Sequence, residues 1–232
     1  MKTLVFELAS DEASFSIPET SSSKLSYAFP PRTTVSGILG AILGIEKDIC
    51  QEMFGKNKVS IAVGIRNPIS TRMIKTNGRK VESGKKNARA QLNEEFIVDP
   101  RYRIYVSCSD EDMYNDLVHL VKIGRPRYMT IGLGRIDCFT YPEYIGEFES
   151  THVNEISTME VHSVIPYKKG KMPNYEIGSE HRISVKSMTN EMNNNRDPID
   201  VINALYDLNA NPITVTTSNI YKLSNGENII FL

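Results

Sequence analysis

The sequence of 232 residues predicts an α+β fold, and three observations lead to this prediction. Apolar residues alternate with polar ones, as in half-buried strands, at 3–8, 59–66 and 96–108. Apolar residues at helical spacing, with start and stop signals, occur at 33–44, 46–54 and 109–124. With a further strand near Ile136 to Phe139, the main order is strand, helix, strand, strand, helix, strand. This is the split βαβ pattern of a ferredoxin-like (RRM-like, βαββαβ) domain.

Two connections in this pattern are unusual. Residues 10–29 are polar, serine-rich and interrupted by Pro18, so they are expected to form a long loop, which is typically functional or mobile. Residues 125–135 form a basic, glycine-rich connection that contains Gly132-Leu133-Gly134-Arg135. The Gly-x-Gly completes no dinucleotide fingerprint, so no nucleotide cofactor is expected.

The first helix has a face with almost no side chains. Pro30 and Pro31 favour an extended backbone before it, and Thr33 or Thr34 is expected to cap it. Small residues fall at i, i+3, i+4 and i+7, namely Gly37, Gly40, Ala41 and Gly44. Glycine costs about 1 kcal/mol relative to alanine inside a helix, so this face implies close approach of another backbone, of protein or nucleic acid. The alternative is a core helix packed tightly on a sheet.

The start of this helix is a candidate phosphate site. Free backbone amides, the positive end of the helix dipole, two threonine hydroxyls and Arg32 are expected to converge there. The helix itself is too short to span a bilayer, which needs about 20 apolar residues.

Basic residues are concentrated in one part of the chain. The formal net charge is −1, yet residues 66–103 contain ten basic and only four acidic residues. Such asymmetry is typical of a local site for a polyanion. Within it, residues 70–95 contain the turn signals Asn77-Gly78 and Ser83-Gly84 and are predicted to form a basic hairpin that protrudes from the sheet. The alternative is a solvated surface loop.

The strand at 96–108 has two different faces. One face is predicted to be buried and consists of Tyr102, Ile104, Val106 and Cys108. The other face consists of Arg101, Arg103, Tyr105 and Ser107. Arginine and tyrosine on an exposed sheet face suit phosphate contact and base stacking.

After about residue 150 the sequence becomes rich in strand-like segments and in asparagine. This change predicts a domain at 1–150 and a smaller β-rich subdomain at 151–232. Strands are expected at Ser157 to Ile165 and His181 to Met188, and a short helix at Asp200 to Leu208. Residues 221–231 contain Asn225-Gly226 and predict a β-hairpin.

The cysteines point to a reducing compartment. Cys50, Cys108 and Cys138 are odd in number and show no zinc or redox spacing, so neither a disulfide framework nor a bound metal is expected. The first strand begins within a few residues of Met1 and leaves no room for a signal peptide. We therefore expect a cytoplasmic protein without a membrane partner.

Several stretches together resemble a known family. Residues 29–44, Phe-Pro-Pro-Arg-Thr-Thr-Val-Ser-Gly-Ile-Leu-Gly-Ala-Ile-Leu-Gly, are similar to the signature of the CRISPR-associated RAMP proteins that form the fifth Cas family. Asn67-Pro68-Ile69 and residues 95–106 resemble the segments around the thumb hairpin of that family, and residues 124–135 its later glycine-containing segment. The resemblance covers residues 1–150 well and the remainder loosely, and its texture is most similar to subtype I-B members.

The resemblance implies a RAMP domain with a thumb at about 70–95 and a role in RNA binding. Such a protein caps one end of the type I Cascade surveillance complex in antiviral defence and holds the 5′ handle of the CRISPR RNA (crRNA). The thumb would reach over the RNA toward the neighbouring backbone subunit, the large subunit would dock nearby, and target DNA would be met through the complex. The candidate RNA-binding residues are Arg32, Thr33, Thr34, Arg66, Arg72, Lys75, Arg79, Lys80, Arg89, Arg101, Arg103 and Arg135.

Two other functions stay open. In one branch of the family this subunit cleaves precursor crRNA without metal, by a mechanism that requires a base, an acid and a cation. The residues of suitable type here are His152, His162, His181, Tyr167 and Lys169. Their spacing fits no zinc site, and each histidine is better explained as a residue on a strand surface or one that satisfies a backbone carbonyl. A non-catalytic protein is therefore expected. The third possibility is a ferredoxin-like domain whose basic loop binds another protein.

Overall fold

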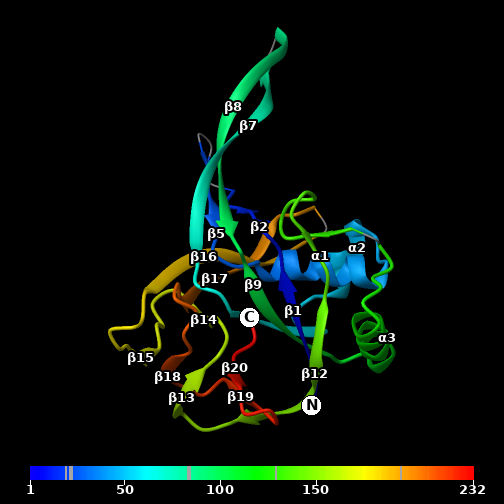
Figure 1. The fold of residues 1–232 in the computed structure, drawn as a ribbon. Coiled ribbons are helices and arrows are strands. Elements are labelled where there is room, and N and C mark those ends of the chain that lie inside the picture. The colour runs from blue at the N-terminus through cyan, green and yellow to red at the C-terminus, as the bar shows by residue number, and fades with distance from the viewer. Residues whose placement is uncertain (19, 21–22, 83–84, 129, 194) are drawn as a thin grey trace.

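The computed structural model describes residues 1–18, 20, 23–82, 85–128, 130–193 and 195–232, and within this part it describes no side chains for residues 78–90. A six-stranded sheet lies at its centre (Figure 1). The strands are β1 (Lys2–Ala9), β6 (Val59–Ile65), β9 (Arg101–Cys108), β12 (Glu143–Val153), β19 (Ile220–Leu223) and β20 (Asn228–Ile229). Their order is β20-β19-β12-β1-β9-β6, and neighbouring strands are antiparallel.

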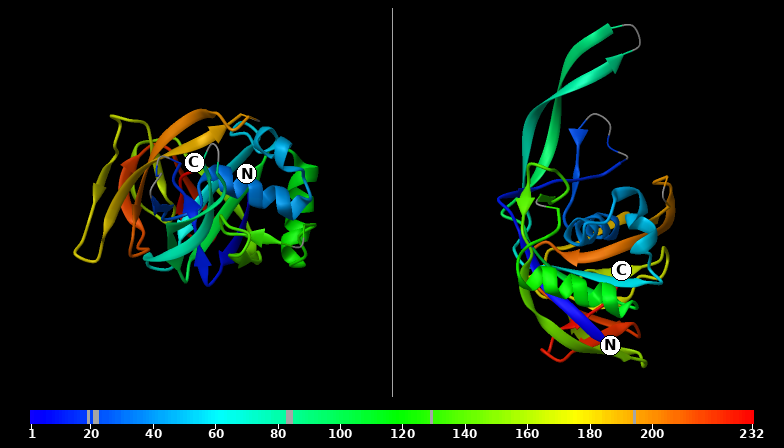
Figure 2. Two further views of the ribbon diagram at one scale, coloured as in Figure 1. Left: turned by 90° about the horizontal axis from the view of Figure 1, so that it is seen from above. Right: turned by 90° about the vertical axis from the view of Figure 1, so that its right-hand side faces the viewer.

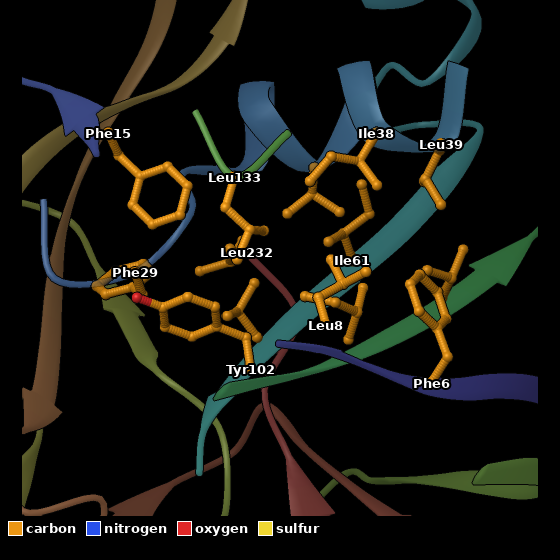
Figure 3. Close-up of a cluster of buried hydrophobic side chains, with 14 of the residues drawn as sticks. Phe6, Leu8, Phe15, Phe29, Ile38, Leu39, Ile61, Tyr102, Leu133 and Leu232 are labelled. Atoms are coloured by element: carbon orange, nitrogen blue, oxygen red, sulfur yellow. The ribbon is translucent and has the colours of Figure 1, made fainter. Parts of the chain in front are cut away.

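Helices pack on one face of this sheet. They are α1 (Arg32–Leu43), α2 (Lys47–Met53) and α3 (Glu111–Lys122). Figure 3 shows Ile38 and Leu39 of α1 close to Phe6, Leu8 and Ile61 of the sheet, and all five side chains belong to one buried cluster. The predicted sequence of strand, helix, strand, strand, helix and strand is present as β1, α1, β6, β9, α3 and β12.

The fourth of these strands lies later in the chain than the sequence predicted. The expected strand near Ile136 to Phe139 is wrong, because this region holds only the two-residue strands β10 (Ile131–Gly132) and β11 (Phe139–Thr140). The strand that completes the pattern in the central sheet is instead β12. It carries several glutamates on its exposed side, so its alternation of apolar and polar residues is weak.

The basic segment forms a long hairpin that extends away from the rest of the molecule (Figures 1 and 2). Its strands are β7 (Ser70–Glu82) and β8 (Lys85–Val98), paired from Ser70 opposite Val98 onward. The turn that the sequence indicated at Asn77-Gly78 is wrong, because Asn77 pairs with Gln91 inside the ladder of β7 and β8. The second turn signal, Ser83-Gly84, lies outside the described residues.

Residues 10–29 were expected to form a long loop, but they also contain short strands. They contain β2 (Glu12–Ala13), β3 (Phe15–Ser16), β4 (Ser23–Lys24) and β5 (Ser26–Tyr27). β2 and β4 pair with β8, while β3 pairs with β5. This segment therefore fastens the base of the hairpin to the body of the molecule.

The last third of the chain is built of strands. Two three-stranded sheets contain β13 (Ser157–Val161), β15 (Asn174–Glu176) and β18 (Ile213–Thr217), and β14 (Ile165–Tyr167), β16 (Ile183–Met192) and β17 (Pro198–Asp207). The helix expected at Asp200 to Leu208 is wrong. Ile202 and Tyr206 join the main core, whereas Leu205 joins a second cluster on the other face, which is the alternation of a strand covered on both sides.

Residues from this last third also cover the second face of the central sheet. Leu223 and Ile229 pack with Val5, Ala62 and Tyr105. The sequence predicted an exposed face for Arg101, Arg103, Tyr105 and Ser107, but Tyr105 has no exposed surface, Ser107 is buried, and Arg103 is mostly covered. Tyr105 is therefore not available for base stacking.

The two predicted parts of the chain share a core. Met188, Ile202, Tyr206 and Leu232 belong to the same buried cluster as the residues under α1. The hairpin predicted at residues 221–231 is present as β19 and β20, with Gly226 in the left-handed region at φ 92°, and it extends the central sheet.

Candidate nucleic-acid interface

The N-terminus of α1 is uncapped by any side chain. Pro31 precedes the helix in an extended conformation, and its carbonyl oxygen accepts from the amides of Thr34 and Val35. The expected cap by Thr33 or Thr34 is therefore wrong, and no acidic residue lies in the first turn. By contrast, the side chain of Asp110 accepts from the amide of Met113 at the start of α3. The positive end of α1 is thus not neutralised locally.

A groove runs along this end of α1. It consists of two cavities, of about 530 and 230 Å³, that share Thr33, Thr34, Gly134 and Met192. We call these cavities the α1 groove. Its walls are the exposed side of α1, the connection at residues 130–134, the segment at 15–18 and the end of β16 with the residues after it.

The glycines of α1 have different roles. A Cβ on Gly40 would lie 2.3 Å from Sγ of Cys50, so Gly40 allows α2 to pack closely. Gly44 ends the helix in the left-handed region at φ 70°. A Cβ on Gly37 would meet nothing within 4 Å, and Gly37 lines the α1 groove. Close packing by protein therefore explains Gly40, whereas Gly37 leaves the helix backbone open to a ligand.

The opposite wall of the groove also depends on a glycine. Gly134 has φ 82°, and a Cβ there would lie 2.0 Å from the carbonyl oxygen of Ser14. The carbonyl of Leu133 accepts from the amide of Ser14, which fixes this connection against the N-terminal segment. The Gly-x-Gly thus positions the wall of the groove.

The groove has charged residues that the sequence did not identify. Among the described residues, Lys47 and Arg196 line it, together with one acidic residue, Asp48. Lys47 follows shortly after the glycine-faced helix, which is a weak signal. Arg196 comes from the far end of the chain, and no local pattern connects it with α1.

Arg32 lies inside the protein and not at the groove. Its side chain is 2% exposed, and Nη2 donates to the carbonyl oxygens of Phe54 and Val59, each at 2.7 Å. Burial lowers the pKa of the guanidinium, and the carboxylates of Glu191 and Asp200 act in the opposite direction. Arg32 therefore joins the end of α2 to the start of β6, and its predicted contact with a phosphate is contradicted.

Arg135 connects the glycine-rich segment to the hairpin. Its guanidinium donates to Asp137 and to the buried carboxylate of Glu94 in β8, the latter at 2.7 Å, and lies over the ring of Phe96. The hydrogen bonds to Asp137 and Glu94 raise its pKa, against the effect of burial. Arg135 is one-third exposed and holds the groove wall to the base of the hairpin.

The hairpin carries five of the other candidates. Arg72 is exposed and forms an ion pair with Glu12. Lys75 is exposed and has no ion pair among the described residues. The side chains of Arg79, Lys80 and Arg89 lie outside the described part of the structure.

Arg66, Arg101 and Arg103 form a separate cluster where β6 ends and β9 begins. All three contact the buried carboxylate of Glu7, and Arg66 and Arg103 also contact Glu227. Arg66 and Arg101 are one-third or more exposed, whereas Arg103 is mostly buried. Arg101 also pairs with Glu143, so the three arginines face three carboxylates, and Arg66 and Arg101 keep part of their guanidinium groups open to solvent beside the hairpin.

The residues of the cleavage hypothesis are only partly brought together. His152 and Tyr167 line one cavity, which Lys168 and Lys171 also line and Lys169 does not. His162 accepts a hydrogen bond from the amide of Asn228, and His181 bonds within the turn at residues 178–181. These two histidines have structural contacts, as the simpler explanation expected.

Neither a metal site nor a membrane helix is seen in the described part of the chain. No cluster of three histidine, cysteine or acidic side chains there could hold a metal ion. Among the same residues, no helix combines the length and apolar content needed to cross a bilayer.

Comparisons with known proteins give the family. No curated protein sequence matches the chain. A crystal structure of a CRISPR protein from Archaeoglobus fulgidus is similar in fold, with 12% identity, a TM-score of 0.63, and 100% of this chain and 99% of that chain covered. A chain of a CRISPR RNA-guided surveillance complex is similar with 11% identity, a TM-score of 0.56, and 93% and 91% covered.

The sequence comparison agrees with the fold. The family model described as CRISPR-associated protein (Cas_Cas5) matches residues 3–199, which is most of the chain. The α+β, strand-rich fold matches that of solved CRISPR proteins over nearly the whole length of the chain. The chain therefore belongs to the Cas5 family of CRISPR-associated proteins.

Proposed function

We propose that this Cas5 family member is a non-catalytic, RNA-binding subunit of a type I Cascade surveillance complex, of subtype I-B, and that it caps the 5′ handle of the crRNA. The observation that carries the proposal is the α1 groove. It combines an uncapped helix start, two threonines and an open glycine, and Arg135, which follows its wall at residues 130–134, bonds to Glu94 at the base of the basic hairpin. Backbone amides at a helix N-terminus bind phosphate oxygens well.

The open face of α1 supports binding of a nucleic-acid backbone in particular. Because Gly37 has no side chain, a sugar-phosphate chain can approach the helix more closely than it could over any other residue. Thr33 and Thr34 supply hydroxyl groups at the same place, and Lys47 and Arg196 supply positive charge. Together these features suit recognition of an RNA strand through its phosphates and its 2′-hydroxyls.

The hairpin and the arginine cluster complete the proposed RNA path. We assign β7 and β8 as the thumb, with Arg72, Lys75, Arg79, Lys80 and Arg89 as its cations. Arg66, Arg101, Arg103 and Arg135 would act at or near its base, where each already pairs with a carboxylate and where Arg66, Arg101 and Arg135 remain partly exposed. Arg32 is not part of this path.

The same proposal covers domains and partners. The strand order β12-β1-β9-β6 supports a ferredoxin-like RAMP domain at 1–150, with residues 151–232 as a β-rich subdomain. The thumb would contact the backbone subunit of Cascade, the large subunit would dock nearby, and target DNA would be reached through the complex. The similar chain of an RNA-guided surveillance complex supports this placement.

Metal-independent cleavage of precursor crRNA is the second candidate. It is favoured by one observation, that His152, Tyr167 and three lysines line one cavity. Nδ1 of His152 lies 2.7 Å from Oδ1 of Asn154, which orients the ring and leaves Nε2 for proton transfer.

One experiment separates the two candidates. Purified protein is incubated with repeat-derived RNA in EDTA, and bound and cleaved RNA are followed together. The RNA-capping proposal expects RNA that is bound and stays intact, with binding that weakens steeply as salt rises. A cleavage product that disappears in His152→Ala would overturn the non-catalytic role, and absence of binding at low salt would overturn RNA capping.

A further inference from the structure

A second groove lies at the end of β6 opposite to the hairpin. Its main cavity, of about 480 Å³, lies between the ends of β12 and β19, the residues after β20, and the segment from β14 to residue 173. We call it the C-terminal groove. Ser60, near the start of β6, lines it, whereas the hairpin begins beyond the other end of β6 (Figure 1).

One wall of the C-terminal groove is a row of three aromatic rings. The rings of His152 and Tyr221 have centroids 4.7 Å apart, and those of Tyr221 and Phe231 lie 4.8 Å apart. His152 is exposed, and Tyr221 and Phe231 are half-buried. Rings that only fill a core are closed off on all sides. These rings are held in place by one another and keep surface open to the cavity.

The rest of the lining is positively charged. Lys56, Lys168 and Lys171 line the cavity, and none of the described residues that line it is acidic. Lys56 and Lys168 both pair with Asp200, so one carboxylate serves two ammonium groups. Positive charge therefore exceeds negative charge at the groove.

The charge continues beyond this cavity. A neighbouring cavity of about 380 Å³ shares Lys56 and Ser60 with it. Lys2 and Lys58 also line this second cavity, and Glu111 is its one acidic residue among those described. The lysines thus follow a path past the aromatic wall and across the edge of β6.

We infer that the C-terminal groove binds a segment of single-stranded nucleic acid, with a base stacked on the ring of Tyr221 and phosphates beside Lys168 and Lys171. A basic path with stacking rings is the general requirement for sequence-tolerant binding of single strands. An acidic peptide would use the lysines but would gain little from the rings. This site is separate from the α1 groove, so the inference does not depend on the proposed RNA-capping role; its cavity is the one considered above for cleavage, and binding there requires no catalysis.

The test uses the full chain and fluorescence anisotropy with a labelled polyuridine RNA and the equivalent polythymidine DNA. Lys168→Gln removes one positive charge of the groove, and Lys171→Glu, made in the same variant, reverses another. Glutamine is chosen at position 168 because glutamate there would place a second carboxylate beside Asp200. We expect this variant to weaken binding about tenfold and to make the salt dependence shallower. Tyr221→Leu should weaken binding to a similar degree, whereas Tyr221→Phe should retain it, since phenylalanine keeps the stacking face.

Lys222→Glu is the matched control. Lys222 follows Tyr221 in β19, so its side chain lies on the other face of the strand, and it does not line the cavity. Thermal unfolding of each variant shows that its fold is intact. The oligonucleotide that binds more tightly, RNA or DNA, identifies the strand that the groove prefers.

Three results would overturn the inference. The first is unchanged oligonucleotide binding in both the lysine variant and Tyr221→Leu. The second is a loss of binding in Lys222→Glu that equals the loss in the lysine variant. The third is binding of a labelled polyglutamate that is as tight as binding of the oligonucleotides. Repeating the measurement in a Gly37→Glu background separates this site from the α1 groove, because the effects of the lysine variant should persist there.

Discussion

Replacing Arg32 by alanine is expected to lower the free energy of unfolding by about 3–6 kcal/mol, since each of two hydrogen bonds to a charged group contributes about 1.5–3 kcal/mol. The substitution removes the donor from the carbonyl oxygens of Phe54 and Val59 and leaves both inside the protein. It also leaves a cavity where a fully buried side chain lay. Chemical denaturation followed by circular dichroism measures the change.

The matched control is Arg125→Ala. Arg125 is exposed, and its side chain has no ion pair among the described residues, so we expect a change within about 0.5 kcal/mol. Under conditions where Arg32→Ala stays folded, its affinity for RNA should equal that of the unmodified protein. Lost RNA affinity with an unchanged free energy of unfolding would show that Arg32 acts on RNA and not on the fold.

Replacing Gly37 by glutamate is expected to weaken RNA binding about tenfold or more, because a carboxylate would stand where a phosphodiester is proposed to lie. The fold should tolerate the change, since a Cβ at this position meets nothing within 4 Å. Electrophoretic mobility shift of repeat-derived RNA measures the affinity, and thermal unfolding measures the stability.

Gly37→Ala provides the control for this prediction. Alanine is better than glycine in a helix interior by about 1 kcal/mol, so this variant should be more stable, and its single methyl group should weaken RNA binding much less than the carboxylate of glutamate does. If Gly37→Glu binds RNA as tightly as Gly37→Ala does, the open face of α1 is not part of the RNA site.

The elements that the sequence predicted correctly have strong local signals. α1 follows two prolines, α3 has Asp110 as its N-cap and an acidic first turn, and the last hairpin contains Asn225-Gly226. β17 was mistaken for a helix because a short apolar run has no period that separates a strand covered on both faces from a buried helix. Its partner strand, β16, decides the outcome through a long ladder.

The site was predictable only where its residues are close in sequence. Thr33, Thr34 and Gly37 lie on one turn of α1, and the segment around Gly134 was recognised from its glycines. Arg196 joins them only through the tertiary fold. The inward direction of the Arg32 side chain could not be predicted either, because the carbonyl oxygens to which it donates lie more than twenty residues away in the sequence.

Mapping the contacts of bound RNA tests the central claim most directly. The protein is bound to repeat-derived RNA that carries 4-thiouridine, irradiated and digested, and the cross-linked peptides are identified by mass spectrometry. We predict cross-links in α1 between Thr33 and Ala41, in residues 130–134 and in the hairpin. Cross-links confined to the C-terminal groove, with none along α1 or the hairpin, would contradict the proposed grip on the RNA.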